Sequence, residues 1–307
     1  MSTLSIIICT YNNSASLLLT LNQLIRCDIP DNHEIELILV DNNSTDQTAE
    51  VCKKTLPRFP FETSYAVEKK QGLSHARNLG LDLSDGEYLL FTDDDADIPR
   101  NWIREYLNVI EKESPHCAFS KIEVIWSQPK PWWYVKQYRP YFVELNYGEN
   151  NINVTDYSKE FYGKNFCVKQ EFLKEIGGFD PNLGRVGTVL LAGEETQIYR
   201  KLIDSGKHVV YFPSALVGHR LKEREYSEEN IEKLFLDGAY SIYLLSRSNA
   251  KKSLFGRPLY ILKDSITKLV IHYLQLLFKS DTKQTKYFHR LKIRQNKLLL
   301  KLWIMNP

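Results

Sequence analysis

The sequence is short of cysteine and of long apolar runs. Its 307 residues include only five cysteines, odd in number and widely spaced, so we expect neither a disulfide framework nor a zinc site, but reduced core thiols in a cytosolic protein. The longest apolar tract near the end, residues 269–278, is broken by His272 and Gln275. It falls well short of the ~20 apolar residues that a membrane-spanning helix needs. No basic segment precedes the apolar run that starts at Leu4, so no signal peptide is expected.

Acidic residues are scarce in the last fifth of the chain. From Arg247 onward there are fourteen basic residues against two acidic ones, Asp264 and Asp281, which gives a net charge of +12. The first 246 residues hold 26 basic and 36 acidic residues, a net charge of −10. The chain is therefore an acidic body with a strongly basic tail. No recognition motif accompanies the basic residues, so we expect no nucleic-acid partner.

The first half of the chain alternates the patterns of buried strands and amphipathic helices. Residues 4–9 form a continuous apolar run, as expected for a strand covered on both faces. Residues 14–27 place leucines on one helical stripe behind a serine that can cap the helix. Further strands are expected at residues 34–40, 61–67 and 88–91, and further helices at 44–57 and 73–83. This order predicts an α/β fold with a doubly wound mixed sheet, parallel at its core and flanked by helices.

Clusters of polar residues follow three of these strands. They are Thr10-Tyr11-Asn12, Asp41-Asn42-Asn43 and the triplet Asp93-Asp94-Asp95. Ligands of such sheets bind at the carboxyl ends of the strands, so all three clusters are expected on one rim. Because side chains alternate along a strand, Asp93 and Asp95 should face the same way. Two carboxylates converging there suit Mg²⁺ or Mn²⁺ shared with substrate phosphates; a solvated acidic turn is the alternative.

The second half is less regular. After a helix near residues 101–113 and a strand near 117–126, the segment 127–160 is rich in proline, aromatics and asparagine. It is too long for an ordinary connection, which predicts a lid or acceptor-side loop with a short helix; a structural flap anchored by aromatics is the alternative. Beyond it we expect strands at 161–168 and 208–212, a helix from about 193 to 204, and helices at 227–248, 255–278 and 282–304.

Six motifs in order resemble family 2 glycosyltransferases. They are residues 10–12, 40–46, 72–78, 91–95, 177–180 and 193–195. The resemblance covers about residues 3–220. It implies the GT-A fold, a single nucleotide-binding α/β domain. It also implies transfer of a sugar from a nucleoside diphosphate to an acceptor hydroxyl, with inversion at the anomeric carbon.

The resemblance implies a divalent cofactor, Mn²⁺ or Mg²⁺, at the aspartate triplet. Asp95 corresponds to the surest metal ligand, and Asp93 to a contact with metal or ribose. His219 looks like the late histidine of the family's metal site, and a neutral imidazole is a sound ligand for Mn²⁺. A capped or buried histidine at a strand end is the alternative for His219. Asp94 should point away, which leaves it a structural role or a ribose contact.

The nucleotide is expected at residues that follow the first two strands. Thr10, Tyr11 and Asp41 stand where the family grips the base. The Asp41 carboxylate can accept the imide N–H of uracil or the N–H groups of guanine, and Tyr11 can stack. Arg77 is placed to neutralise the diphosphate or to contact the base. Ordinary packing for Tyr11 and an ion pair for Arg77 are the alternatives.

Inverting transfer in one displacement needs a general base near the acceptor hydroxyl. Glu195 stands at the family position of that base, with Glu194 contacting the acceptor or orienting Glu195. The chain departs here from the commoner pattern, which has Asp at the second position. Two acids that only complement a helix dipole are the alternative. For acceptor binding we expect Asp180, Trp132 and Trp133.

We expect two domains. Residues 1–225 would form the nucleotide-sugar-binding and catalytic domain, with 127–160 and 181–192 as acceptor-side loops, and residues 226–307 a basic amphipathic helical region. Helices with an apolar and a cationic face can lie on anionic membrane, here through 247–307. Packing of the apolar stripe onto the catalytic domain, or a homodimer, is the alternative.

The sequence thus predicts a metal-dependent inverting glycosyltransferase. Its donor would be a nucleotide sugar, with UDP favoured, and its acceptor a glycan or lipid-linked glycan in bacterial surface polysaccharide synthesis. It would be cytoplasmic, peripheral at the inner face of the plasma membrane. The rivals are a non-catalytic sugar-nucleotide-binding or scaffold protein of the same fold, and a sugar nucleotidyltransferase. A sugar nucleotidyltransferase would need a glycine-rich, basic triphosphate-binding loop after the first strand, and residues 10–14 do not provide one.

Overall fold

The computed structural model describes residues 3–31, 33–187, 189–248, 253–254, 257–279 and 282–305. Part of the predicted basic region 247–307, including Asp281, lies outside the described residues, as does Thr188 of the predicted loop 181–192. The chain forms two compact units. Unit 1 consists of Met1–Ile125, Phe142–Asn182 and Glu194–Arg220; unit 2 consists of Trp126–Tyr141, Leu183–Gly193 and Leu221–Pro307. The predicted domain division at 225/226 stays a prediction.

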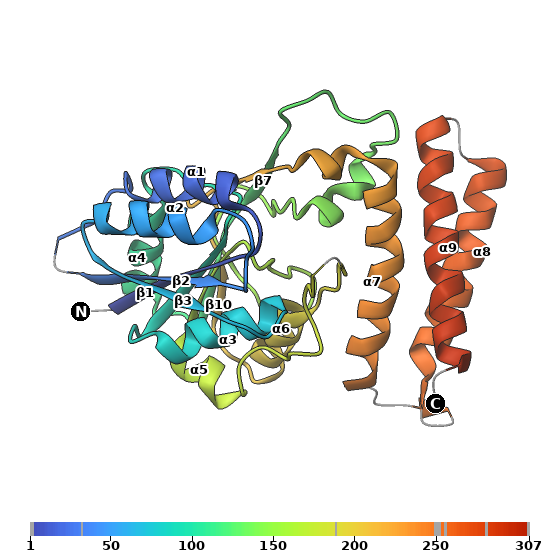
Figure 1. The fold of residues 1–307 in the computed structure, drawn as a ribbon. Coiled ribbons are helices and arrows are strands. Elements are labelled where there is room, and N and C mark those ends of the chain that lie inside the picture. The colour runs from blue at the N-terminus through green and yellow to red at the C-terminus, as the bar shows by residue number, and fades with distance from the viewer. Residues whose placement is uncertain are drawn as a thin grey trace. The chain divides into compact units, whose positions relative to one another are not determined.

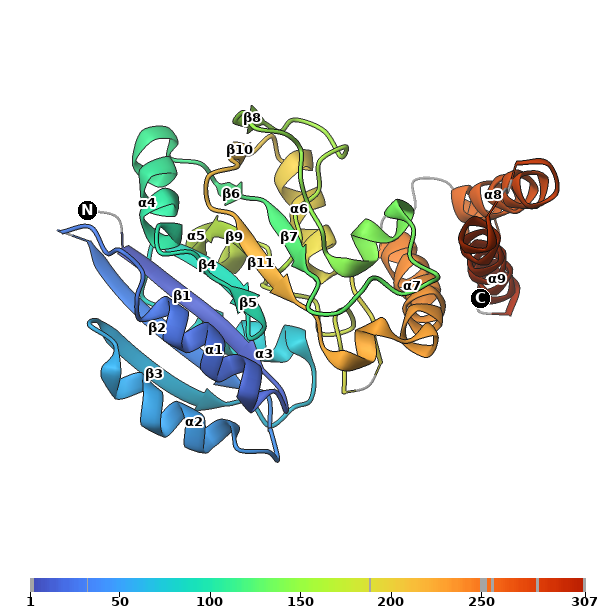
Figure 2. The same ribbon diagram turned by 90° about the horizontal axis from the view of Figure 1, so that it is seen from above.

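Unit 1 is built on an eight-stranded mixed sheet with the strand order β3-β2-β1-β4-β9-β6-β10-β8 (Figures 1 and 2). β1, β2, β3 and β4 are mutually parallel, whereas β9 runs antiparallel to both β4 and β6. The strands are β1 Thr3–Thr10, β2 Glu34–Asp41, β3 Glu62–Val67, β4 Tyr88–Asp93, β6 Cys117–Phe119, β8 Ile152–Asn153, β9 Asn165–Lys169 and β10 Val209–Tyr211. The predicted α/β class with a mixed sheet and a parallel core is confirmed.

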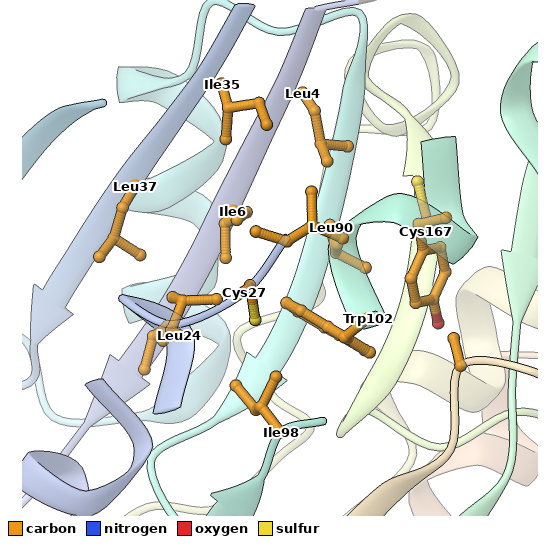
Figure 3. Close-up of a cluster of buried hydrophobic side chains, with 14 of the residues drawn as sticks. Leu4, Ile6, Leu24, Cys27, Ile35, Leu37, Leu90, Ile98, Trp102 and Cys167 are labelled. Carbon is orange, nitrogen blue, oxygen red and sulfur yellow. The ribbon is translucent and has the colours of Figure 1, made fainter. Parts of the chain in front are cut away.

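The side chains of the central strands alternate between the two faces of the sheet and are buried on both. Ile6 and Ile8 of β1 belong to one core cluster and Ile7 to the other, as the two-residue period of a strand requires. The first cluster contains residues of α1, α2 and α4, the second residues of α3, α5 and α6; Figure 3 shows part of the first. The helices are α1 Ser14–Leu24, α2 Thr48–Thr55, α3 Leu73–Leu83, α4 Trp102–Glu113, α5 Gln170–Glu175 and α6 Glu194–Asp204. Full burial of one such aliphatic side chain stabilises the fold by about 1.5–3 kcal/mol.

Strand register fixes the rim on which the polar clusters lie. Thr10 pairs with Asp41 between β1 and β2, and Cys9 pairs with Asp93 between β1 and β4. The three strands therefore end side by side, and the loops that follow them leave from one edge. Asn12 and Asn43 take the left-handed conformation there, with φ of 47° and 62°, which suits asparagine in turns. The predicted common rim is confirmed.

Two predicted strands differ from those observed. The strand expected at 161–168 begins only at Asn165, because residues 163–164 form a turn before it. The strand expected at 117–126 is two strands, β6 and β7 Ile122–Ile125, which belong to different sheets. β7 joins β5 Ala96–Asp97 and β11 Val217–Arg220 in a three-stranded sheet of order β5-β11-β7.

Unit 2 is mainly helical. Its long helices are α7 Glu228–Ser248, α8 Leu259–Phe278 and α9 Lys283–Met305, and β12 Ser253–Leu254 pairs antiparallel with β13 Arg257–Pro258. The 3₁₀ helix Lys136–Phe142 is the short helix predicted in the aromatic segment, and the ring of Tyr141 stacks on Phe235 of α7 at 4.2 Å. None of the helices within the described residues is both long and apolar enough to cross a membrane.

Candidate functional site

A buried lysine contacts two carboxylates of the aspartate triplet. β9 runs antiparallel to β4 with Thr92 opposite Asn165, so Lys164 enters β9 where Asp93 leaves β4. The Lys164 ammonium lies 3.0 Å from Asp93 Oδ2 and donates to Asp95 Oδ1. Burial works against the Asp93 carboxylate, but Lys164 and Arg77 outweigh it and hold its pKa below the ordinary value. The same carboxylates raise the pKa of Lys164 against the effect of its burial.

His219 lies against the other oxygen of Asp95. β11 pairs with β5 so that His219 is opposite Ala96, the residue after Asp95. His219 Nε2 is 3.8 Å from Asp95 Oδ2, and Nδ1 is 2.8 Å from the carbonyl oxygen of Phe142. A carbonyl only accepts, so Nδ1 carries the hydrogen, and in the neutral ring Nε2 keeps its lone pair on the Asp95 side. A backbone carbonyl behind a ring is the arrangement that orients metal-binding histidines.

The aspartate triplet is joined to the acid pair by Arg77. Arg77, on α3, is buried; its Nη1 donates to Glu194 Oε1 at 2.8 Å and its Nη2 is 3.7 Å from Asp93 Oδ1. Gly163 makes this approach feasible, because a Cβ at that position would collide with the guanidinium. The predicted metal site and the predicted catalytic pair thus lie on either side of one guanidinium.

The two acids at the start of α6 differ in exposure. Glu194 is buried and Glu195 is half-buried. Burial, reinforced by the charge of Glu195 and opposed by Arg77, raises the pKa of Glu194 to about 8. The two carboxyls are close enough to share a hydrogen bond once Glu194 holds a proton. When both groups are ionised, the Oε2 atom of each is buried and accepts no hydrogen bond from the described residues. Because buried polar atoms are generally hydrogen-bonded, these oxygens can take up a proton or accept a hydrogen bond from a ligand.

Asp94 ties β1 to β4. Its Oδ2 accepts from Thr10 Oγ1 at 2.8 Å and its Oδ1 accepts from Asn13 Nδ2 at 2.6 Å. The backbone oxygen of Asp94 accepts from Thr20. Asp94 therefore points away from Asp93 and Asp95, as the strand alternation predicts, and it holds the rim in shape.

Asp41 is buried at the rim and already hydrogen-bonded. Its Oδ2 accepts from the Tyr65 hydroxyl at 2.7 Å and its Oδ1 from the Ser44 N–H at 2.8 Å. An ionised carboxylate has about four acceptor positions, so these two hydrogen bonds leave acceptor capacity at Asp41. Tyr11 is largely exposed on the adjacent loop, where its ring is accessible for stacking.

The predicted acceptor residues belong to different units. Asp180, in unit 1, accepts from the Asn182 N–H at 2.9 Å and is 3.4 Å from Gln197 of α6. Trp132 and Trp133 belong to unit 2. Trp132 is exposed, whereas Trp133 is 1% exposed. Of the two rings, only that of Trp132 offers surface to an acceptor.

The sequence did not predict the role of Lys164, nor that of its neighbour Asn165. Asn165 is buried, and its side-chain amide makes four hydrogen bonds: Oδ1 accepts from Trp102 and Tyr106, and Nδ2 donates to the carbonyls of Lys121 and Ala215. These bonds fix the backbone beside Lys164. A lysine directly before an apolar strand is a weak signal. Only the antiparallel register of β9 reveals its partners.

The donor set fits a divalent cation in type. Two carboxylates and an imidazole nitrogen are ligands that Mn²⁺ accepts, and the Nδ1 bond of His219 supports that reading. The positions of the side chains are a different matter: among the described residues, no three His, Cys, Asp or Glu side chains lie close enough together to hold a metal. The Lys164 ammonium lies between the two carboxylates instead.

The family of the chain follows from its match to a protein-family model. The model of the family described as "Glycosyl transferase family 2" matches residues 5–177, more than half of the chain. The chain belongs to glycosyltransferase family 2. It is 24% identical over 226 residues to the glucosyl-dolichyl phosphate glucuronosyltransferase of Haloferax volcanii, covering 71% of this chain and 69% of that protein. It is 22% identical over 225 residues to the succinoglycan biosynthesis protein ExoM of Rhizobium meliloti, covering 72% and 67%.

Solved structures agree on the fold. The mannosyltransferase from Pyrobaculum calidifontis, solved in complex with GDP-Man and Mn²⁺, superposes with a TM-score of 0.65 at 16% identity and covers 99% of this chain and 87% of that one. At this identity the likeness concerns the fold alone. The family 2 enzyme described here has the GT-A fold, which confirms the fold that the motifs imply.

Proposed function

We propose that this glycosyltransferase moves a sugar from a nucleoside-diphosphate sugar to a hydroxyl of a glycan or lipid-linked acceptor, with inversion. The observation that carries the proposal is the continuous set of ionisable groups in unit 1. It runs from Asp95 and Asp93 through Arg77 to Glu194 and Glu195. A diphosphate-binding end and a proton-accepting end are what one-step transfer requires.

A UDP-sugar is the proposed donor. Asp41 can accept the imide N–H of uracil and Tyr11 can stack on the base, while Thr10 lies beside them at the end of β1. Asp93, Asp95 and His219 would hold Mn²⁺ or Mg²⁺. The bound cation would supply Lewis-acid stabilisation of the charge that develops on the departing diphosphate. The mannosyltransferase neighbour binds a GDP-sugar, so the choice of nucleotide is an outcome to be measured.

Glu195 is the proposed general base. Its carboxylate would take the proton of the acceptor hydroxyl as the hydroxyl oxygen bonds to the anomeric carbon and the bond to the diphosphate breaks. The buried Oε2 atom of Glu195 that no described residue donates to supports this role. Glu194, held by Arg77, would orient Glu195.

The carboxylate pair provides the test. Glu195→Gln should lower the rate of nucleotide release from the donor by about 10²–10⁴-fold, the usual contribution of a general base, with unchanged donor affinity by calorimetry. Glu194→Gln should cost less, and Glu123→Gln, an exposed acid of β7, should match wild type. A Glu195→Gln enzyme that keeps wild-type turnover would remove Glu195 from the mechanism. Donor binding without release in wild type would favour the non-catalytic rival.

The polysaccharide and membrane context is also a proposal. The Rhizobium meliloti relative is named for succinoglycan biosynthesis, which supports a bacterial surface polysaccharide as product. The name of the Haloferax volcanii relative contains a glucosyl-dolichyl phosphate, which supports a lipid-linked acceptor. On α8 one stripe of apolar residues is exposed, and exposed basic residues recur along α9. We place the enzyme at the inner face of the plasma membrane through this region, with binding to anionic vesicles as the expected result. The α8 residues are Ile266, Val270, Leu274 and Phe278; the α9 residues are Lys286, Arg290, Lys297 and Lys301.

A further inference from the structure

Lys164 sits where the proposed function needs a metal ion. Its ammonium contacts Asp93 and Asp95 together, and its side chain is 2% exposed. No other lysine has such a setting among the described residues: the buried Lys121 pairs with Glu149, whose carboxylate is exposed. Lys164 is also firmly placed, because the four hydrogen bonds of the Asn165 amide anchor the backbone beside it.

The Asp93 and Asp95 carboxylates already have a cationic partner, so a divalent ion that binds there alone would meet positive charge. The Lys164 ammonium contacts both carboxylates, and Arg77, which also pairs with Glu194, adds positive charge 3.7 Å from Asp93. A divalent ion arriving alone would meet repulsion that burial strengthens. It would also leave the displaced ammonium without an anionic partner, which is costly in a buried site. A diphosphate that arrives with the ion removes both penalties, because it brings negative charge for the ammonium.

We propose that Lys164 and the divalent cation compete for the Asp93–Asp95 pair, so that the enzyme takes up the cation together with the donor diphosphate and not before it. The inference deepens the proposed function and rests on it for the identity of the diphosphate. It makes Lys164 a positioning residue that sets the order of binding. Because coupling between two ligands is reciprocal, the nucleotide must also bind more tightly when the metal is present.

The test is a set of Mn²⁺ titrations, followed by electron paramagnetic resonance of free Mn²⁺. Wild type, Lys164→Met and Lys121→Met are each titrated alone and with saturating UDP, and again with GDP. In wild type, nucleotide should tighten Mn²⁺ binding by about tenfold or more, within the usual range of coupling between sites. Lys164→Met should bind Mn²⁺ alone about tenfold more tightly than wild type and lose most of the coupling. Lys121→Met should behave as wild type.

Three results would overturn the inference. The first is equal or weaker binding of Mn²⁺ alone by Lys164→Met. The second is wild-type binding of Mn²⁺ that is not tightened by a nucleotide shown to bind. The third is a charge-preserving Lys164→Arg variant that binds Mn²⁺ alone as tightly as Lys164→Met is expected to. The wild-type and Lys164→Arg arms decide the matter if Lys164→Met does not fold. The arms without nucleotide separate this inference from the proposed function. Should no variant bind UDP or GDP, the donor proposal fails, while the competition at the carboxylates is still judged by Mn²⁺ alone.

Discussion

At the scale of single residues, the site is a set of buried and half-buried ionisable groups that depend on one another. Arg77 links Glu194 to Asp93, and Lys164 links Asp93 to Asp95. Breaking a buried ion pair from one side costs about 3–5 kcal/mol, because the remaining charge loses its partner. The arrangement therefore links the proposed diphosphate-binding end of the site to the proposed proton-accepting end.

Glu194 gives the folded protein a pH dependence of known sign. Its pKa is raised from 4.5 to about 8 by burial and by Glu195. Between these values the folded protein keeps a proton that the unfolded chain releases, so the free energy of unfolding contributed by Glu194 falls as pH rises. Thermal unfolding at pH 5 and pH 8 should show a smaller loss of stability for Glu194→Gln than for wild type. Glu123→Gln is the control, and equal losses in all three proteins would contradict the raised pKa.

The sequence identified most acids of the site and the cation Arg77, but not Lys164. Asp93, Asp95, Glu194 and Glu195 stand in motifs whose order is distinctive, and local alternation was enough to bring the two aspartates to one side. Lys164 has no motif. Its role depends on pairing between β4 and β9, which are more than seventy residues apart, and antiparallel insertion of a strand into a parallel sheet leaves no local signal.

At the scale of elements, helix α8 offers the sharpest test. Val270 and Leu274 are 53% and 50% exposed and lie one turn apart, so they bury little apolar surface in the described structure. The double variant Val270→Gln, Leu274→Gln should leave the melting temperature nearly unchanged and reduce sedimentation with anionic vesicles severalfold. Each exposed apolar side chain contributes to burial in the interface, and basic residues add attraction to anionic lipid.

The control is Ile261→Gln on the same helix. Ile261 is 3% exposed, so this variant should lose stability. Wild-type protein that stays in the supernatant with anionic vesicles, and forms a dimer that the double variant abolishes, would assign the stripe to a second copy of the chain.

At the scale of the whole molecule, the sequence predicted the class of unit 1 and the helices of unit 2. The strand and helix periods of residues 3–93 are local and sufficed there; α3 has the predicted bounds, Leu73–Leu83. Segments Trp126–Tyr141 and Leu183–Gly193 group with the C-terminal helices. That grouping rests on contacts such as Tyr141 with Phe235, which link distant parts of the chain and follow no period.

The measurement that tests the central claim most directly is a donor screen on the purified protein. Release of UDP, GDP and dTDP from a panel of nucleotide sugars would be followed with Mn²⁺ and with EDTA, for wild type and Asp95→Ala. The account predicts release of UDP from one donor with Mn²⁺, little with EDTA, and loss of about 10²-fold or more in Asp95→Ala, which removes charge stabilisation at the leaving diphosphate. Release that is indifferent to both EDTA and Asp95→Ala would contradict it.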